Sequence, residues 1–161
     1  MENKEILKIA KKVKKALKGK TDFVSIEQYL KTIGYKVVFY NTPNGDKYLT
    51  KLDLLTDASA VPAFTYTGAG NIIFIDNNAS SEDKNYLLYH ELGHIALGHM
   101  EDKRLITRNK MLLEMEAETF ANYLINDNTK DCKATVLLCA LASAGAVIGT
   151  MLLKKAVKAD V

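Results

Sequence analysis

The ten residues from His90 to His99, His-Glu-Leu-Gly-His-Ile-Ala-Leu-Gly-His, contain the pattern H-E-x-x-H and constrain this chain more than any other stretch. Positions i and i+4 of a helix lie on one face, so His90 and His94 can present their imidazoles to one metal ion. Glu91 is rotated by about 100° from His90, which suits a base that reaches a metal-bound water from the side. Hydrolysis by an activated water needs imidazoles that bind zinc, and it needs a carboxylate beside them that accepts the proton of the water. The pattern therefore predicts a metal site, provided that it lies on a helix.

The surrounding residues predict that helix. Ser80 and Ser81 are good N-cap residues, and Glu82 and Asp83 follow in the first turn, where the helix dipole favours acids. Gly98 is a plausible C-terminal stop. Apolar residues recur between them at helical spacing: Leu87, Leu88, Leu92, Ile95 and Ala96. A bare H-E-x-x-H match can also be a pair of core histidines, but the capped helix favours a metal site.

A third ligand decides the class of the site. The metzincin continuation would need glycine at position 97 and histidine at position 100, where the chain has Leu97 and Met100. We therefore interpret His99 as an exposed histidine that ends the helix, not as a ligand.

A glutamate on a second helix is the other solution, and residues 109–125 offer one. Glu114 and Glu118 share one face of this helix, whereas Glu116 points elsewhere. We expect Glu114 to be the third metal ligand and Glu118 to be an acceptor that orients a histidine. A solvated acidic face is the alternative. The stripe that faces the core is Leu113, Ala117, Phe120 and Leu124.

Two stretches carry a resemblance to a known family: residues 90–99, and the run Glu114-Met115-Glu116-Ala117-Glu118-Thr119-Phe120-Ala121. They are similar to the H-E-L-G-H helix and the following E-x-E-A-x-x-F-A helix of the ImmA/IrrE family of small zinc metallopeptidases. The resemblance implies a gluzincin-like fold and a role in mobile-element or stress regulation, through cleavage of a repressor-like protein. The chain departs from the family where it reads Leu124-Ile125-Asn126-Asp127 in place of a Leu-Leu-Met-Pro-like ending, and in its apolar C-terminal run.

The residues and the resemblance together predict a zinc-dependent endopeptidase with one Zn²⁺ held by His90, His94 and Glu114. Glu91 is expected to deprotonate the zinc-bound water and to pass the proton to the leaving amine. One alternative uses the same residues: a zinc-containing regulatory module that binds a transcription factor without proteolysis. Another is a membrane-anchored interaction protein with a degenerate site, and the intact His90, Glu91 and His94 argue against it. The candidates for the group that stabilises the oxyanion are Tyr66, Tyr89, Tyr123 and His99.

The rest of the chain predicts an α+β fold, a small zincin-like domain whose mixed or antiparallel sheet packs on the two site helices. In chain order we expect helices over 2–18 and 25–33, a strand over 35–40, a turn over 42–46, and a β-hairpin of strands 63–67 and 71–75. Ser25 is the expected cap of the second helix. For residues 48–61 the sequence is compatible with either a short helix or a loop. The hairpin is a candidate edge for an extended substrate, with a plain core strand as the alternative.

The charge is unevenly placed. The first 20 residues carry eight lysines and two glutamates, a net +6, and the other 141 residues carry 14 basic and 17 acidic side chains, a net −3. The lysines of the amphipathic N-terminal helix, residues 1–20, could touch nucleic acid or an anionic membrane. We prefer a solvated face, because no DNA-binding motif accompanies them, and expect no direct nucleic-acid partner.

The domain organisation predicted is a metallopeptidase domain over 1–128 and an apolar C-terminal segment over 129–161. Residues 134–153 are 20 residues without charge, a length that matches a hydrocarbon core of about 30 Å. A transmembrane helix is slightly preferred there over a buried C-terminal helix. Cys132 and Cys139 read as free thiols in a reducing compartment. No apolar segment of a signal peptide follows the basic start, so we expect a cytoplasmic protein, with a membrane anchor through 134–153 as an option.

Overall fold

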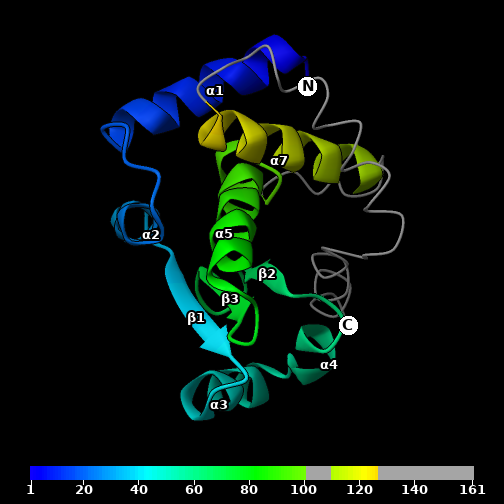
Figure 1. Cartoon of the computed structure of the whole chain (residues 1–161). Coiled ribbons are helices and arrows are strands. Elements are labelled where there is room, and N and C mark those ends of the chain that lie inside the picture. Colours follow the sequence, from blue (N-terminus) through cyan, green and yellow to red (C-terminus); the bar gives the residue numbers. More distant parts are fainter. Residues whose placement is uncertain (101–109, 127–161) are drawn as a thin grey trace.

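The structure is a computed structural model that describes residues 1–100 and 110–126 (Figure 1). It confirms the predicted α+β class. The helices are α1 (Asn3–Ala16), α2 (Phe23–Thr32), α3 (Pro43–Leu52), α4 (Leu55–Ala58), α5 (Ser81–Ala96) and α7 (Lys110–Ile125), and the strands are β1 (Lys36–Tyr40), β2 (Ala63–Tyr66) and β3 (Ile72–Asp76).

The three strands form one mixed sheet in the order β1-β3-β2. β1 runs parallel to β3, with Val38 opposite Phe74, and β2 runs antiparallel to β3, with Thr65 opposite Ile73. The antiparallel pair is the predicted hairpin. β2 pairs with β3 alone among the described strands, so it lies at an edge of the sheet.

Both faces of the sheet are covered, and alternation along the strands decides which side chain faces which layer. Ile73 and Ile75 of β3 belong to the core that contains α1, α2, α5 and α7. Ile72 and Phe74 of the same strand belong to a second core with residues of α3 and α4. α5 and α7 therefore lie on one face of the sheet, and α3 and α4 lie on the other (Figure 1).

α7 crosses α5, and α1 packs along α7 (Figure 1). The predicted stripe of α7 is confirmed, since Leu113, Ala117, Phe120 and Leu124 are all buried. The apolar side of α1 is buried as well, through Ile6, Ala10, Val13 and Leu17. Large apolar groups from three helices thus fill the core next to the H-E-x-x-H segment, and burying a side chain such as Phe120 contributes about 1.5–3 kcal/mol.

The predicted turn over 42–46 is wrong, because these residues begin α3. The hydroxyl of Thr42 accepts a hydrogen bond from the Gly45 amide at 3.1 Å, and Pro43 occupies the first helical position. Threonine as a cap and proline at the first position start helices as readily as they form turns. Residues 48–61, which the sequence left open, complete α3 and form α4.

The predicted cap of the second helix is also wrong. Asp22, not Ser25, caps α2, and its carboxylate accepts hydrogen bonds from both the amide and the hydroxyl of Ser25 at 3.0 and 2.7 Å. An aspartate three residues before a serine competes for the same role, and the sequence alone did not separate the two.

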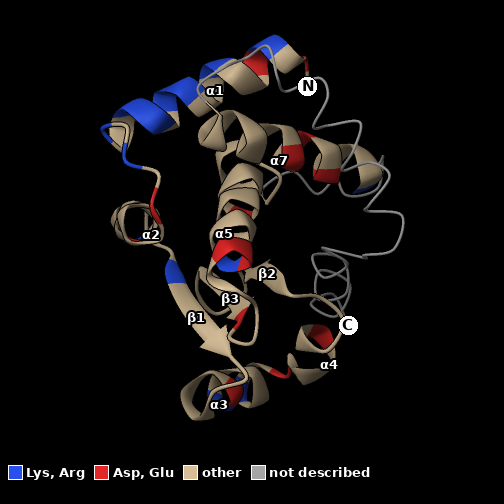
Figure 2. Ribbon diagram, viewed as in Figure 1, with Lys and Arg blue, Asp and Glu red and all other residues tan. Residues whose placement is uncertain are grey.

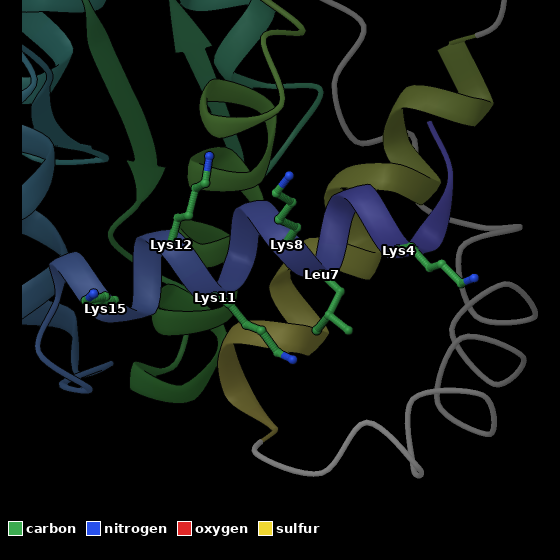
Figure 3. A pocket seen from close by; sticks show the side chains of 6 residues that line it. All are labelled: Lys4, Leu7, Lys8, Lys11, Lys12 and Lys15. Carbon is green, nitrogen blue, oxygen red and sulfur yellow. The ribbon is translucent and has the colours of Figure 1, made fainter.

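Lysines follow the whole length of α1 (Figure 2), and its exposed face carries Lys4, Lys8, Lys11, Lys12 and Lys15. Lys14 instead donates a hydrogen bond of 3.4 Å to the carbonyl of Leu124 in α7. A shallow surface hollow of about 430 Å³ runs along this face (Figure 3), and it is lined by Lys4, Leu7, Lys8, Lys11, Lys12 and Lys15. The lining residues that the structure describes all come from α1, so this hollow is separate from the H-E-x-x-H segment. The solvated-face interpretation stays a prediction.

Several predictions concern residues outside the described ranges: the domain boundary at 128, the C-terminal segment 129–161 with its candidate helix 134–153, and Cys132 and Cys139. Among the helices within 1–100 and 110–126, none has the length and apolar character needed to cross a membrane.

Candidate metal centre

α5 carries the H-E-x-x-H residues into the protein interior. Ser80 caps the helix by accepting a hydrogen bond from the Asp83 amide at 3.1 Å, as the sequence predicts. His90, Glu91 and His94 are only 4%, 3% and 5% exposed. Three adjacent buried polar groups are unusual unless each has a partner or a ligand. The partners come from β2, from α7 and from the residues that follow α5.

α7 approaches α5 closely at Gly93. A β-carbon on Gly93 would lie 2.9 Å from the carbonyl oxygen of Ala117 and 3.2 Å from the Phe120 ring. Only a glycine permits this contact without movement of one helix. The crossing brings Glu114, one turn before Ala117, over the two imidazoles on either side of Gly93.

His90, His94 and Glu114 present three ligand atoms to one point, and all three atoms lie within 4.8 Å of one another. His90 Nε2 lies 3.1 Å from His94 Nε2 and 3.1 Å from Glu114 Oε2, and His94 Nε2 lies 3.5 Å from the same oxygen. Ligands of a tetrahedral zinc ion with bonds of about 2.0–2.1 Å are about 3.3 Å apart. The triangle thus has the size of one face of such a tetrahedron, and two nitrogens with one carboxylate oxygen are a suitable donor set.

The electrostatics of this triangle favour a positive charge. Burial lowers the pKa of His90, but the neighbouring carboxylates of Glu114 and Glu118 outweigh it and raise the pKa to about 10. Burial likewise raises the pKa of Glu114, but hydrogen bonds from His90 and His94 outweigh it and lower the pKa to about 2. The α7 residues Glu114 and Glu118 place carboxylate oxygens 3.1 and 3.6 Å from the two ring nitrogens of His90. A cation at the triangle is therefore stabilised by its surroundings.

Glu91 is held by Thr65, a residue that no sequence motif singles out. The hydroxyl of Thr65 on β2 donates a hydrogen bond of 2.6 Å to Glu91 Oε2, and both side chains are buried. Thr65 faces α5 because it shares a face of the edge strand with Ala63, whose side chain is in the core with α5. The only sequence signal was a polar residue in an otherwise apolar strand. One carboxylate oxygen of Glu91 is thereby fixed by the sheet.

His99 is not the exposed residue that we predicted. It is 1% exposed, because α5 ends in a Schellman motif that folds the chain back. Gly98 has a positive φ of 74°, its amide donates to the Ile95 carbonyl, and the His99 amide donates to the His94 carbonyl at 3.0 Å. In this motif the second residue after the cap returns to the last turn of the helix. The run Leu97-Gly98-His99 contains the glycine that this motif needs, but a glycine alone predicts only where the helix ends.

The ring of His99 connects His94 with Glu116. His99 Nδ1 lies 3.0 Å from His94 Nδ1, and His99 Nε2 lies 3.1 Å from Glu116 Oε2. Burial and the neighbouring His94 lower the pKa of His99 to about 4 despite the carboxylate of Glu116, so the ring is neutral at pH 7. Glu116 is 6% exposed, and its other oxygen contacts the amino group of Met1. Glu116 therefore does point away from Glu114, but into the protein.

Glu118 lies on the other side of the two rings. Its Oε2 is 3.6 Å from His90 Nδ1, which is longer than a hydrogen bond. His90 Nδ1 is buried, and within residues 1–100 and 110–126 it has no hydrogen-bond partner nearer than this. The position agrees with the expected role of Glu118 as an acceptor for His90, and that role stays a proposal.

Three of the four candidates for oxyanion stabilisation are engaged elsewhere. Tyr66 packs with the core of α3 and α4, on the sheet face opposite α5. The Tyr89 hydroxyl donates to the carbonyl of Thr21. His99 lies between His94 and Glu116. Tyr123 is the fourth candidate. Its partly buried side chain packs against the core that contains α1, α5 and α7, and its role in oxyanion stabilisation stays a prediction.

Comparison with known proteins gives one match. The family model of Peptidase M78, described as the IrrE N-terminal-like domain, matches residues 45–130. Searches of curated proteins and of solved structures gave no significant match. The matched range holds α5 and α7, hence every member of the candidate metal centre, and it covers 86 of the 161 residues. This agrees with the resemblance in the H-E-L-G-H and E-x-E-A-x-x-F-A stretches, and the chain belongs to the Peptidase M78 family of IrrE N-terminal-like domains.

Proposed function

We propose that this protein is a zinc-dependent endopeptidase whose metal is held by His90, His94 and Glu114 and whose base is Glu91. The observation that carries the proposal is the triangle of ligand atoms, with edges of 3.1, 3.1 and 3.5 Å, beside a buried glutamate that is fixed by Thr65. Membership of a peptidase family supports it independently.

A zinc ion at the triangle would supply a Lewis acid that polarises a peptide carbonyl and acidifies a water. The chain's own residues do the rest. Glu91 accepts the proton of the attacking water and then delivers it to the departing amine, so that it acts first as a base and then as an acid. The hydrogen bond from Thr65 occupies Glu91 Oε2 and leaves the other oxygen for the proton transfer.

An extended peptide segment is the proposed substrate form. β2 lies at the edge of the sheet and carries Thr65 next to Glu91, so a strand added to this edge would pass beside the base. Strand addition of this kind binds peptides through main-chain hydrogen bonds. We further propose that the substrate is a repressor-like regulatory protein, as the family resemblance implies.

The test is incubation of the zinc-loaded protein with a repressor-type transcription factor as the candidate substrate. The zinc-loaded protein is expected to cut it at one or few sites, and removal of zinc with a chelator is expected to stop cleavage. Glu91→Gln is expected to bind zinc normally and to cleave at least about 100-fold more slowly, because general-base catalysis contributes about 10²–10⁴-fold.

The same experiment separates the peptidase from a zinc-containing module that only binds its partner. A module of that kind would form a stable complex with the repressor in both wild type and Glu91→Gln, and would leave the repressor intact. Full proteolytic activity in Glu91→Gln with bound zinc would rule out the proposed mechanism.

A further inference from the structure

A buried chain of polar side chains leaves the candidate metal centre on the side of His94. It runs from His94 Nδ1 to His99 Nδ1 over 3.0 Å and from His99 Nε2 to Glu116 Oε2 over 3.1 Å. All three side chains are less than 10% exposed. Neither His99 nor Glu116 has a ligand atom in the triangle, so the proposed reaction does not use them directly.

We propose that His99 and Glu116 are positioning residues that fix the tautomer and the ring orientation of His94, and thereby its ability to bind zinc. This inference rests on the proposed zinc site. His99 follows the glycine that ends α5, and Glu116 points away from the metal. Both residues would then contribute to zinc affinity without binding the ion.

The direction of each hydrogen bond follows from chemistry. A carboxylate only accepts hydrogen bonds, so Glu116 requires that His99 Nε2 carries a proton and donates it. A neutral imidazole has one N–H, so His99 Nδ1 must then be an acceptor. His94 Nδ1 must therefore donate, which leaves the lone pair of His94 Nε2 free for the metal. The carboxylate of Glu116 thus fixes the tautomer of His99, and His99 in turn fixes the tautomer of His94.

The backbone holds this arrangement in place. The His99 amide donates to the His94 carbonyl in the Schellman motif, so the two rings are attached to a closed turn. Glu116 comes from α7, whose packing at Gly93 also sets the position of Glu114. A single helix crossing thus positions one glutamate on the metal side of His94 and another on the far side.

A matched pair of variants tests the role of His99. Asparagine and leucine have nearly the same shape, but Asn Oδ1 is attached to Cγ as Nδ1 is in histidine and can accept from His94. Loss of a partner of this kind costs about 10–100-fold in metal affinity. We therefore expect the dissociation constant for zinc, measured by competition with a chromogenic chelator, to rise about 10–100-fold in His99→Leu and clearly less in His99→Asn.

Wild type provides a test that does not depend on variants. In the zinc-loaded, ¹⁵N-labelled protein, NMR should show the His94 proton on Nδ1, the His99 proton on Nε2, and a scalar coupling between the two Nδ1 nuclei across the hydrogen bond. Glu116→Leu removes the acceptor for His99 Nε2–H, so it should lose this pattern and weaken zinc binding.

The outcomes are distinct. One contrary result is that His99→Leu binds zinc as tightly as wild type does, or more tightly than His99→Asn does. Either result would show that His99 only fills space, and it would overturn the inference while leaving the zinc site standing. A proton on His99 Nδ1 in wild type would overturn it as well. Zinc binding in wild type no tighter than in His94→Ala would overturn the proposed site and this inference together.

Discussion

Gly93 lies against the backbone of Ala117, and this contact determines how the two site helices meet. A β-carbon on Gly93 would lie 2.9 Å from the Ala117 carbonyl oxygen and 3.1 Å from its Cα. The glycine is one of the two unspecified positions of H-E-x-x-H, yet it sets the distance between the imidazoles of α5 and the glutamates of α7.

Gly93→Ala is expected to push α7 away from α5. Overpacking of a tight core contact costs about 1–3 kcal/mol in unfolding free energy, which denaturant titration measures. Zinc affinity should fall in the same variant, because Glu114 moves with α7. Gly34→Ala is the matched control: it strains a backbone with φ of +87° but meets no atom within 4 Å. It should lose stability and keep the zinc affinity of wild type.

Glu114→Ala is expected to lose most of its bound zinc, because it removes one of three ligand atoms in the triangle. Glu116→Ala should retain zinc with weaker affinity, since Glu116 contacts His99 rather than the triangle. Metal analysis of the two purified variants beside wild type decides between them. Complete loss of zinc in Glu116→Ala, with retention in Glu114→Ala, would mean that the third ligand is Glu116.

Thr65→Val is expected to reduce kcat without changing zinc content. The substitution keeps the shape of the side chain but removes the 2.6 Å hydrogen bond that fixes Glu91. A small misplacement of a catalytic group can cost about 100-fold in rate, so we expect a loss of about 10–100-fold. Thr65→Ser keeps the hydroxyl and should recover most of the rate. Equal rates for Thr65→Val and wild type would contradict the positioning of Glu91 by β2.

The protein should lose stability in alkaline solution through Tyr40. Burial, assisted by the charge of Asp76, raises the pKa of Tyr40 to about 12 from an ordinary value of 10.0. The folded state thus holds the phenol proton more tightly than the unfolded state does. Its contribution is complete below pH 10 and decreases as the pH rises from about 10 through about 12.

Tyr40→Phe should reduce this alkaline loss, and the remainder is expected from Tyr89, whose pKa burial also raises. The Tyr40 hydroxyl donates to the Val61 carbonyl at 2.6 Å, so the variant should also be about 1–2 kcal/mol less stable at neutral pH. Thermal unfolding of wild type and variant between pH 8 and about 11 measures both effects. Tyr48→Phe removes an exposed tyrosine and should keep the alkaline loss.

The sequence by itself determined the elements that carry the candidate site. A helix with H-E-x-x-H, an N-cap at Ser80 and a second helix with glutamates four residues apart are local patterns, and helical periodicity places their side chains on defined faces. The same reasoning predicted that Glu114 and Glu118 share one face and that Glu116 does not. It also predicted the hairpin, because β-rich runs around glycines are local signals.

Only the tertiary structure decided which groups meet across elements. Thr65 reaches Glu91 because an edge strand packs beside α5, and His99 reaches Glu116 because a Schellman turn returns the chain toward α7. These contacts join residues 26 and 17 positions apart, and no periodicity within one element encodes them. The sequence predicted that His99 lies on the surface, whereas in the structure it is buried beside His94. The surroundings of a side chain depend on what packs over it and not on its own sequence neighbours.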